Sequence, residues 1–308
     1  MTPPSPRAAV VIVSYNVAAH LRRCLTSLHR SAGLPVEVII VDNGSADGSA
    51  ELVRKDFGAA ALIARADNAG FARAANEGAR ATHAPYLFFL NPDTVVHDGA
   101  LPALVAFLDA HPRAAVVAPR LHTPADRLES TLRDEPTAFN LLREHLPLFR
   151  RRAARWDRHE RRRRADWVVG AALLVRRAVF DAVGGFDERF PLYYEDADLC
   201  LRLGDAGYEC WLEPAARITH YGGASALATF GSAAEVRLRY LAARDALIRR
   251  RRGAAAATRY RLGQTVFLAG RWLAAALRGD RAARAFVRRA WEVTWGKNKP
   301  PATRAADA

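Results

Sequence analysis

The sequence predicts an α/β domain with a mostly parallel sheet flanked by helices, followed by a basic helical extension. Short apolar runs alternate with segments whose apolar residues recur every three or four positions. This alternation is typical of strands and helices in a parallel sheet that is covered on both faces. Polar and acidic residues follow several of the apolar runs directly, at the sheet edge where such folds bind ligands.

The expected elements follow one another along the chain. Strands are expected at 9–13, 36–41, 60–64, 86–90, 114–118, 167–175 and 211–219, with helices at 17–30, 46–57, 71–82, 98–110 and from Glu195. Residues 121–166 contain three prolines and several runs of arginine, and are expected to form a mobile basic loop. We expect one domain over residues 1–235 and a helical extension over 236–308.

The charge of the chain is segmental. The 308 residues have a formal charge of +14, and after residue 235 basic residues outnumber acidic ones by 18 to 4. Half of the residues are hydrophobic, which excludes a wholly disordered chain. The basic segments indicate a polyanionic partner, which is a nucleic acid, an anionic lipid surface or a phosphorylated substrate.

The cysteines, the first residues and the longest apolar segment indicate the cellular compartment. Cys24, Cys200 and Cys210 contain no C-x-x-C pair, so we expect neither a disulfide framework nor a cysteine zinc site. The first residues lack the charged and then apolar order of an export signal. The longest apolar segment, 262–277, is interrupted by Arg271, so no spanning helix is expected. These features favour the cytoplasm.

Three strand ends are followed by polar residues that core packing does not require. Ser14, Tyr15 and Asn16 end the first strand, and Asp42 ends the second. Asp42 can accept hydrogen bonds from a base or ribose, or can belong to a turn, and the sequence does not decide between the two. After the third strand comes a segment from Asn68 through Gly70 to Arg73, where a glycine at a helix start lets the backbone approach a phosphate.

Two acidic motifs are candidates for chemistry. Asp93 lies just past the fourth strand, where it is either an oxygen ligand for a hard cation that bridges to a diphosphate or a helix cap. Glu195, Asp196 and Asp198 lie within four positions of a helix start. That is more negative charge than a helix dipole needs.

Taken in order, five segments resemble the family 2 glycosyltransferases, and within them the bacterial rhamnosyltransferase-like branch. They are Val-Ser-Tyr-Asn at 13–16, Val-Asp-Asn-Gly-Ser at 41–45, Asn-x-Gly-Phe-Ala at 68–72, Asn-Pro-Asp at 91–93 and Glu-Asp-x-Asp at 195–198. The resemblance implies a GT-A fold, a nucleoside-diphosphate sugar donor and a divalent metal, Mn²⁺ or Mg²⁺. It also implies inverting transfer to a lipid-linked or cell-surface polysaccharide acceptor, with L-rhamnose from dTDP-rhamnose as the leading donor.

The same resemblance implies roles for individual residues. Asp196 is the expected general base. The expected donor-binding residues are Ser14, Tyr15, Asn16, Asp42, Asn68, Gly70, Arg73 and Asn91, the acceptor-binding residues are Trp167, Gly170 and Glu195, and the metal ligands are Asp93 and His220. Asn91 stands where the family often has a first metal-binding Asp, so His220 is needed as an additional ligand. For Trp167, a core position beside a strand is the commoner explanation.

The extension contains an amphipathic segment. Its apolar stripe is Leu262, Val266, Gly270, Leu273 and Leu277, and the opposed polar residues are Arg261, Gln264, Arg271 and Arg278. Such a helix either lies on an anionic bilayer surface or packs its stripe on the catalytic domain. We expect peripheral attachment to the cytoplasmic face of the plasma membrane.

Other functions remain open at this point. One is a polyprenyl-phosphate sugar synthase of the same family, and another is a catalytically silent homologue, which the presence of Asp93, Asp196 and His220 disfavours. An arginine-rich nucleic-acid-binding protein is the alternative from another class. The arginine runs lack the interleaved aromatic residues that stack on bases, so no nucleic-acid partner is expected.

Overall fold

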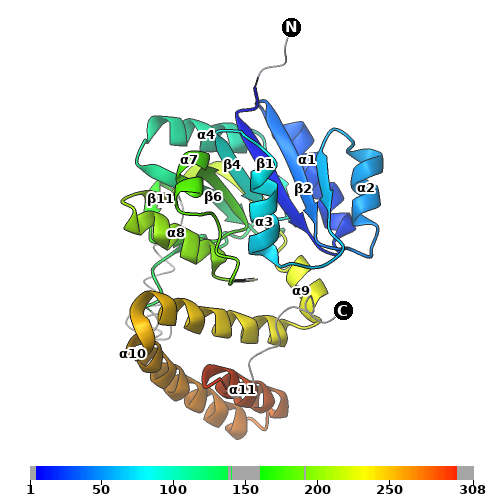
Figure 1. The fold of residues 1–308 in the computed structure, drawn as a ribbon. Helices are drawn as coiled ribbons and strands as arrows, with labels where there is room; N and C mark the ends of the chain where they lie inside the picture. The colour runs from blue at the N-terminus through cyan, green and yellow to red at the C-terminus, as the bar shows by residue number, and fades with distance from the viewer. Residues whose placement is uncertain (1–4, 138–139, 141–159, 191, 297–308) are drawn as a thin grey trace.

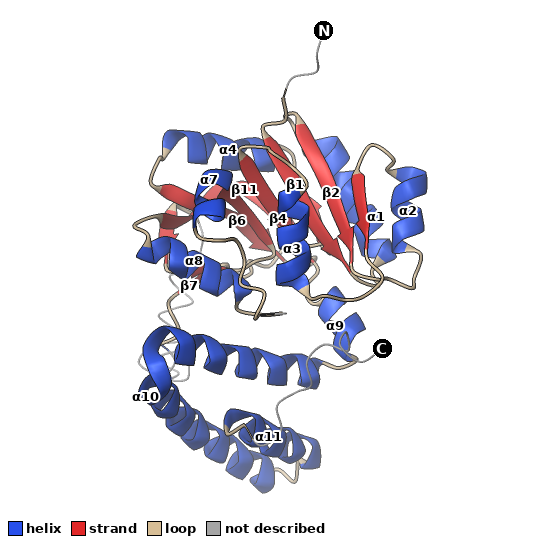
Figure 2. Cartoon of the chain, in the orientation of Figure 1, coloured by secondary structure: helices blue, strands red, loops and turns tan. Residues whose placement is uncertain are grey.

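The computed structural model describes residues 5–137, 140, 160–190 and 192–296. Within these residues the chain forms a central sheet with helices on both faces and a helical hairpin beyond one edge of the sheet (Figure 1, Figure 2). The strands are β1 (Ala8–Ser14), β2 (Val36–Asp42), β3 (Ala61–Ala64), β4 (Tyr86–Leu90), β5 (Thr94–Val96), β6 (Ala114–His122), β7 (Leu132–Arg133), β8 (Arg163–Ala165), β9 (Trp167–Val168), β10 (Ala172–Arg176) and β11 (Glu209–His220). The helices are α1 (Ala18–Ser31), α2 (Ser49–Asp56), α3 (Phe71–Arg80), α4 (Ala100–Ala110), α7 (Arg177–Ala182), α8 (Glu195–Asp205), α9 (Ala224–Phe230), α10 (Ala233–Leu277) and α11 (Arg281–Thr294).

The sheet is mostly parallel. Its strand order is β3-β2-β1-β4-β10-β6-β11-β5, and β8 pairs with β11 beside this path. Strand β10 runs antiparallel between β4 and β6, while β5 and β8 are antiparallel to β11. Strands β7 and β9 form a separate antiparallel pair. The predicted fold class is therefore confirmed.

The central strands β1 and β4 are almost wholly apolar because both faces of the sheet are covered. Every residue of β1 is buried. Val11 and Val13 pack on the face covered by α3, α7 and α8, whereas Val10 and Ile12 pack on the face covered by α1 and α4. Successive side chains of a strand point to opposite faces, so each strand contributes to two cores.

The carboxyl ends of the parallel strands meet at one edge, and α9 and α10 lie beyond that edge (Figure 1). The antiparallel β10 begins there, because Ala172 pairs with Leu90 at the end of β4. The short segment before β10 therefore joins the loops that follow β1, β2, β3 and β4. This is the edge where parallel sheets bind their ligands.

The largest differences from the sequence prediction lie between 119 and 176. The single strand expected at 167–175 is two strands, because the Val169 N–H donates to Thr131 and the Ala171 carbonyl accepts from Asn91 instead of continuing one ladder. The described parts of the expected loop 121–166 include β7, β8 and the end of β6. The expectation of a mobile loop concerns mainly residues 138–139 and 141–159, which lie outside the described residues.

The extension is a hairpin. Helix α10 changes direction at Gly253, where φ is 81° and ψ is 175°, so we call residues 233–252 its first limb and 254–277 its second limb. Leu238 of the first limb, Leu268 of the second limb and Val287 of α11 share a small core. Leu247 of the first limb belongs to the core under the sheet, so the hairpin packs on the α/β domain. Among the described residues, no helix has both the length and the apolar composition needed to cross a bilayer.

Ion pairs hold the bend of the hairpin against the domain. Arg251 Nη1 lies 2.9 Å from Asp205 Oδ2, and Arg252 Nη2 lies 2.5 Å from Glu135 Oε2. The hydrogen bond from Arg252 lowers the pKa of the Glu135 carboxyl. Much of the arginine run at 249–252 thus faces carboxylates of this chain.

Candidate active site

A cavity of about 230 Å³ lies at the carboxyl edge of the sheet. Loops that follow β1, β2, β3, β4 and β11 line it together with the start of α8 and residues of α9. The expected site residues in its lining are Tyr15, Asn68, Gly70, Asn91, Asp93, Gly170, Glu195, Asp196 and His220. The fold therefore brings together candidates that are spread over more than 200 positions of the sequence.

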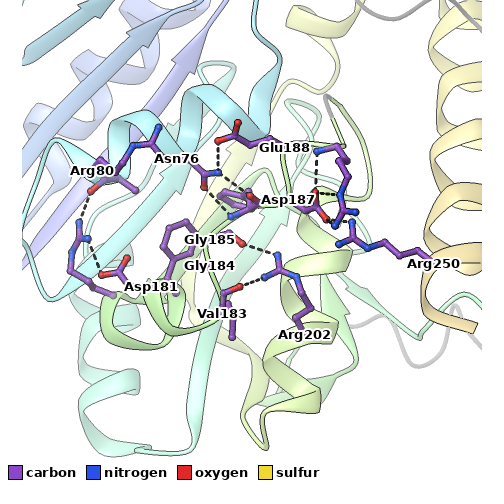
Figure 3. A pocket seen from close by; sticks show the side chains of 15 residues that line it. Asn76, Arg80, Asp181, Val183, Gly184, Gly185, Asp187, Glu188, Arg202 and Arg250 are labelled. Atoms are coloured by element: carbon purple, nitrogen blue, oxygen red, sulfur yellow. Dashed lines mark hydrogen bonds and ion pairs between the residues drawn. The ribbon is translucent and has the colours of Figure 1, made fainter.

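A larger cavity, of about 520 Å³, lies elsewhere on the domain, between α3, α7 and the loop before α8 (Figure 3). Arginine and carboxylate side chains dominate its wall, and many of them bond to one another or to backbone carbonyls. None of the expected site residues lines it. We therefore assign the candidate active site to the smaller cavity.

The loops after β1 and β2 are tied to each other. The Asn16 side chain accepts a hydrogen bond from the Ala46 N–H at 2.8 Å, and the Asn16 N–H donates to the Ser45 hydroxyl at 3.0 Å. Asp42 accepts from both the N–H and the hydroxyl of Ser45. Asn16 and Asp42 do not line the cavity. In this structure they shape the two loops.

Asn43 is a cavity residue that the sequence analysis did not select. Its side chain is buried and donates to the Gly70 carbonyl at 3.2 Å, while its Oδ1 has no hydrogen-bond partner in the described part of the chain. Gly70 precedes α3 with φ 83° and ψ 168°, a conformation that favours glycine. A buried amide oxygen without a partner at a cavity wall indicates a site for a polar ligand. Its position directly after Asp42 in the second strand-end motif was the available signal.

Asp93 and His220 face each other in the cavity wall. Both side chains are buried, and His220 Nε2 lies 3.5 Å from Asp93 Oδ1. On the other side of the ring, Nδ1 lies 2.9 Å from Oε2 of Glu129. Burial alone lowers the pKa of His220, but the two carboxylates outweigh burial and raise the pKa to about 9. Glu129 lies in the expected loop 121–166. It was not predicted as a site residue because it is 91 positions away from His220 in the sequence.

This pair fits a divalent cation in part. A separation of 3.5 Å between an imidazole nitrogen and a carboxylate oxygen is one that two ligands of the same ion can have, and both atoms lie at the cavity. Within the described ranges no group of three or more His, Cys, Asp or Glu side chains is arranged to hold a metal. Among the described residues, Asp93 and His220 are therefore the two candidate ligands, and a bound diphosphate would have oxygens to supply others.

Glu195 and Asp196 begin α8 and line the same cavity. Burial raises the pKa of Asp196 to about 6, although the N–H groups of Gly170 and Ala197 each donate to its carboxylate at 2.7 Å. Burial and the adjacent charge of Asp196 raise the pKa of Glu195 well above its ordinary value. Glu195 Oε2 has no hydrogen-bond partner among the residues described. Both carboxyl groups therefore hold a proton more readily than an exposed carboxylate does.

Gly170 is fitted closely to Asp196. A Cβ at position 170 would lie 3.0 Å from both the Cβ and Oδ2 of Asp196. The absence of a side chain allows the Gly170 N–H to reach the carboxylate. Arg133 on β7 adds a positive charge that opposes the rise in the pKa of Asp196, and it too was missed because β7 was expected to be loop.

Four other residues lie outside the cavity lining. Ser14 is fully buried at the end of β1, and Arg73 is exposed on α3. Trp167 is buried, donates from Nε1 to the Asp134 carbonyl and packs 5.8 Å from the ring of Tyr194, as a core residue would. Asp198 is paired with Arg202 at 2.7 Å, which agrees with a structural role.

Comparison with known proteins places this geometry in a family. The family model described as glycosyl transferase family 2 matches residues 9–183. An N-acetylglucosaminyl-diphospho-decaprenol L-rhamnosyltransferase of Mycobacterium tuberculosis is 33% identical over 233 residues, which span 69% of this chain and 75% of the relative. Rhamnosyltransferase WbbL of Escherichia coli is 46% identical over 56 residues, or 18% of this chain and 21% of WbbL.

Solved structures show the same fold. Mannosyltransferase PcManGT from Pyrobaculum calidifontis, in complex with GDP-Man and Mn²⁺, superposes with a TM-score of 0.58 at 17% identity. The match covers 95% of this chain and 88% of PcManGT. This likeness concerns the fold, and the expected GT-A-like arrangement with a C-terminal helical region is thereby confirmed.

Proposed function

Because this chain belongs to glycosyl transferase family 2, we propose that it transfers L-rhamnose from dTDP-rhamnose to a hydroxyl group of a lipid-linked or cell-surface polysaccharide acceptor, with inversion. The name of the M. tuberculosis relative supports both the sugar and a lipid-linked acceptor. The observation that supports catalysis most is that one cavity is lined by both Asp196 and the Asp93–His220 pair.

Asp196 is the proposed general base. A carboxylate with a pKa of about 6 is ionised at neutral pH and is still basic enough to accept a proton in the transition state. As the acceptor oxygen bonds to the anomeric carbon, its proton passes to Asp196. The bond between that carbon and the diphosphate oxygen breaks, and its electron pair leaves with dTDP. The proton on Asp196 is later released to solvent.

Glu195 is the proposed residue that binds the acceptor by a hydrogen bond. Its raised pKa favours the protonated form, whose O–H can donate to an acceptor oxygen while Asp196 accepts from the reacting hydroxyl. Gly170 keeps the carboxylate of Asp196 in place. The two neighbouring carboxyl groups thus take different roles because their proton affinities differ.

Asp93 and His220 are the proposed protein ligands of Mn²⁺ or Mg²⁺. Such a cation, when bound, supplies positive charge against the diphosphate as it departs. Glu129 fixes the ring of His220 through Nδ1, so that Nε2 faces Asp93. The mixed imidazole and carboxylate set favours Mn²⁺ over Mg²⁺.

Asp196→Asn tests the base. The amide keeps the size of the side chain but cannot take the proton, so transfer of rhamnose from dTDP-rhamnose should fall by about a hundredfold or more. Stabilisation of the variant by dTDP-rhamnose in a thermal-shift assay should persist. Asp181→Asn, a carboxylate in the larger cavity, is the matched control and should transfer normally. Normal turnover by Asp196→Asn would contradict the assignment.

The second limb of α10 supports attachment to a membrane surface. Leu262, Val266, Leu273 and Leu277 of the predicted stripe are exposed, and Val266 and Leu277 are 74% and 82% exposed. Gln264, expected on the opposed polar face, is buried, and Arg261 is paired with Asp245 at 2.5 Å. The second limb buries Tyr260, Gln264 and Leu268 and leaves the predicted stripe at the surface, so the stripe does not pack on the α/β domain.

The surroundings of the stripe favour anionic lipid as its occupant. Trp272 on the same limb and Trp291 on α11 are exposed, and tryptophan is enriched where proteins meet a bilayer interface. Arg271 and Arg278 are exposed on the same hairpin. An apolar stripe flanked by tryptophan and arginine fits a peripheral protein on an anionic surface, and we place it on the cytoplasmic face of the plasma membrane.

Vesicle flotation tests this attachment. The full chain should float with vesicles of phosphatidylcholine and phosphatidylglycerol, and less with phosphatidylcholine alone. Replacing Leu262, Val266, Leu273 and Leu277 by glutamine should reduce binding by about tenfold or more without touching a core. Leu128→Gln, at an exposed leucine of the domain, is the control. If the stripe variant instead abolishes a dimer in sedimentation and vesicles do not bind, the occupant is a second copy and the membrane proposal is wrong.

The rival functions are less well supported. A nucleic-acid-binding role was suggested by the arginine runs, yet Arg251 and Arg252 are paired with Asp205 and Glu135 of the same chain. A polyprenyl-phosphate sugar synthase would use the phosphate of the lipid as the acceptor. Product analysis with a polyprenyl phosphate and with a polyprenyl-diphospho-N-acetylglucosamine separates these two reactions.

A further inference from the structure

The turn that leads into the catalytic helix has an unfavourable backbone conformation. Tyr193 and Tyr194 have φ angles of 70° and 66° and are followed directly by Glu195 and Asp196. The left-handed region disfavours residues with a side chain, and two such residues in succession persist only where the surroundings hold them. The position of Asp196 therefore depends on what packs against the two tyrosines.

The first limb of α10 packs against both tyrosines. The ring of Tyr240 lies 4.8 Å from the ring of Tyr194 and 5.8 Å from that of Tyr193, measured between centroids. Tyr194 is buried, with Trp167 against it at 5.8 Å. The turn is therefore enclosed between the domain and the extension.

Arg244 packs against the ring of Tyr240. Its side chain is buried, its guanidinium carbon lies 5.9 Å from the Tyr240 ring centroid, and its Nε donates to the hydroxyl of Tyr260 at 3.0 Å. Tyr260 belongs to the second limb, beyond the bend at Gly253. Both limbs of the hairpin thus converge on the residue that supports the turn.

The first limb of α10 also contacts Asp187, in the loop that leads to the turn at Tyr193 and Tyr194. Arg250 forms an ion pair with Asp187 (Figure 3). Arg250 and Tyr240 are ten residues apart, or about 15 Å along a helix. The first limb therefore contacts the chain both before and after residues 188–192, just ahead of the catalytic carboxylates.

We propose that the first limb of α10 is a positioning element of the active site, with Tyr240 as its main positioning residue and Arg244 and Arg250 in support. Tyr240 acts through Tyr193 and Tyr194 on Asp196, and touches neither the donor nor the acceptor. The extension is thus required for catalysis as well as for attachment. This inference rests on the proposed role of Asp196 as the base.

Tyr240→Ala tests the proposal with two independent readouts. The first is amide hydrogen exchange over 193–198, which includes the Asp198 N–H that donates to the Tyr194 carbonyl at 2.8 Å. Exchange there should rise by about tenfold or more, since the turn loses its support. The second is transfer from dTDP-rhamnose to polyprenyl-diphospho-N-acetylglucosamine, in which kcat should fall by about tenfold while the donor KM changes by less than about twofold.

The controls separate positioning from stability. Tyr240→Phe keeps the ring and should behave as the wild type in both readouts. Leu238→Ala removes a buried residue of the same limb that packs toward α11, so it should lower Tm without changing exchange over 193–198 or kcat. Arg250→Gln, at a partly exposed side chain, should raise exchange at 187–190 even if Tyr240→Ala does not fold.

Equal exchange over 193–198 in Tyr240→Ala and Leu238→Ala would overturn the proposal, as would unchanged exchange in Arg250→Gln. If the wild type fails to transfer rhamnose, the proposed function is wrong, while the exchange comparison, which needs no substrate, still decides the positioning role.

Discussion

Replacing Gly170 by alanine should disturb the base while leaving the rest of the site intact. The new Cβ would lie 3.0 Å from Asp196 Oδ2, a tight contact, so we expect the carboxylate to move by a few tenths of an ångström and the 2.7 Å hydrogen bond from the residue 170 N–H to weaken. A hydrogen bond to a charged group contributes about 1.5–3 kcal/mol, and about 1.4 kcal/mol corresponds to one pKa unit. Loss of the bond should therefore raise the pKa of Asp196 from about 6 by about one to two units.

The assay is the pH dependence of kcat/KM for rhamnose transfer. Transfer needs the ionised base, so the acidic limb of the profile should move to higher pH in Gly170→Ala, and the rate near pH 7 should fall by about two- to tenfold. Gly170 does not have a positive φ, so alanine adds no backbone strain. Gly204→Ala, in α8 with no atom within 4 Å of the new Cβ, is the control. An unchanged acidic limb in Gly170→Ala would refute this account of the base.

Three further predictions follow from the same geometry. In the wild type, transfer should rise with pH and level off above about pH 7, because the pKa of Asp196 is about 6; a flat profile from about pH 5 upward would exclude Asp196 as the titrating base. Glu129→Ala frees Nδ1 of His220 and should raise the Mn²⁺ concentration for half-maximal activity by about tenfold or more, and an unchanged titration would remove Glu129 from the site. Gly78→Ala should lower the free energy of unfolding by about 1–3 kcal/mol in a denaturant melt, because its Cβ would meet Val11 Cγ1 at 2.5 Å, and an unchanged midpoint would contradict this tight packing.

Local sequence predicted the sheet well because its strands are buried on both faces. The run Tyr86–Leu90 is apolar at every position and coincides with β4. Strand β8 was missed, since Arg163–Ala165 lies in an arginine run and has no apolar pattern. Its pairing with β11 depends on backbone hydrogen bonds to a segment more than 40 residues away. Such pairing leaves no mark on the local sequence.

The candidate site was predictable where residues follow strand ends directly. Asp93 and His220 lie at the cavity because the strands bring their ends to one edge, whereas Asp196 was predicted from the acidic motif at the start of α8. Glu129 and Arg133 were not predicted as site residues. Both lie in the segment after β6 that was expected to be a loop, and their roles depend on which residues that segment contacts in the fold. The donor, acceptor and metal roles of the individual residues stay predictions.

The direction of the extension's stripe could not be read from its periodicity. A period of 3.6 residues identifies an apolar face but does not say which face is covered. The covered side of the second limb contains Tyr260, Gln264 and Leu268, and Arg261 pairs with Asp245 of the first limb. The stripe is therefore left exposed, because a second set of apolar residues on the same helix packs inside the hairpin.

The bend at Gly253 determines how far the second limb of α10 lies from the α/β domain. An unbroken helix over the 45 residues of α10 would be a rod about 68 Å long, with its far end well away from the α/β domain. The φ of 81° and ψ of 175° at residue 253 belong to a region that is open almost only to glycine, and they fold this rod back on itself. This single glycine thereby fixes the distance between the catalytic cavity and any surface that binds the hairpin.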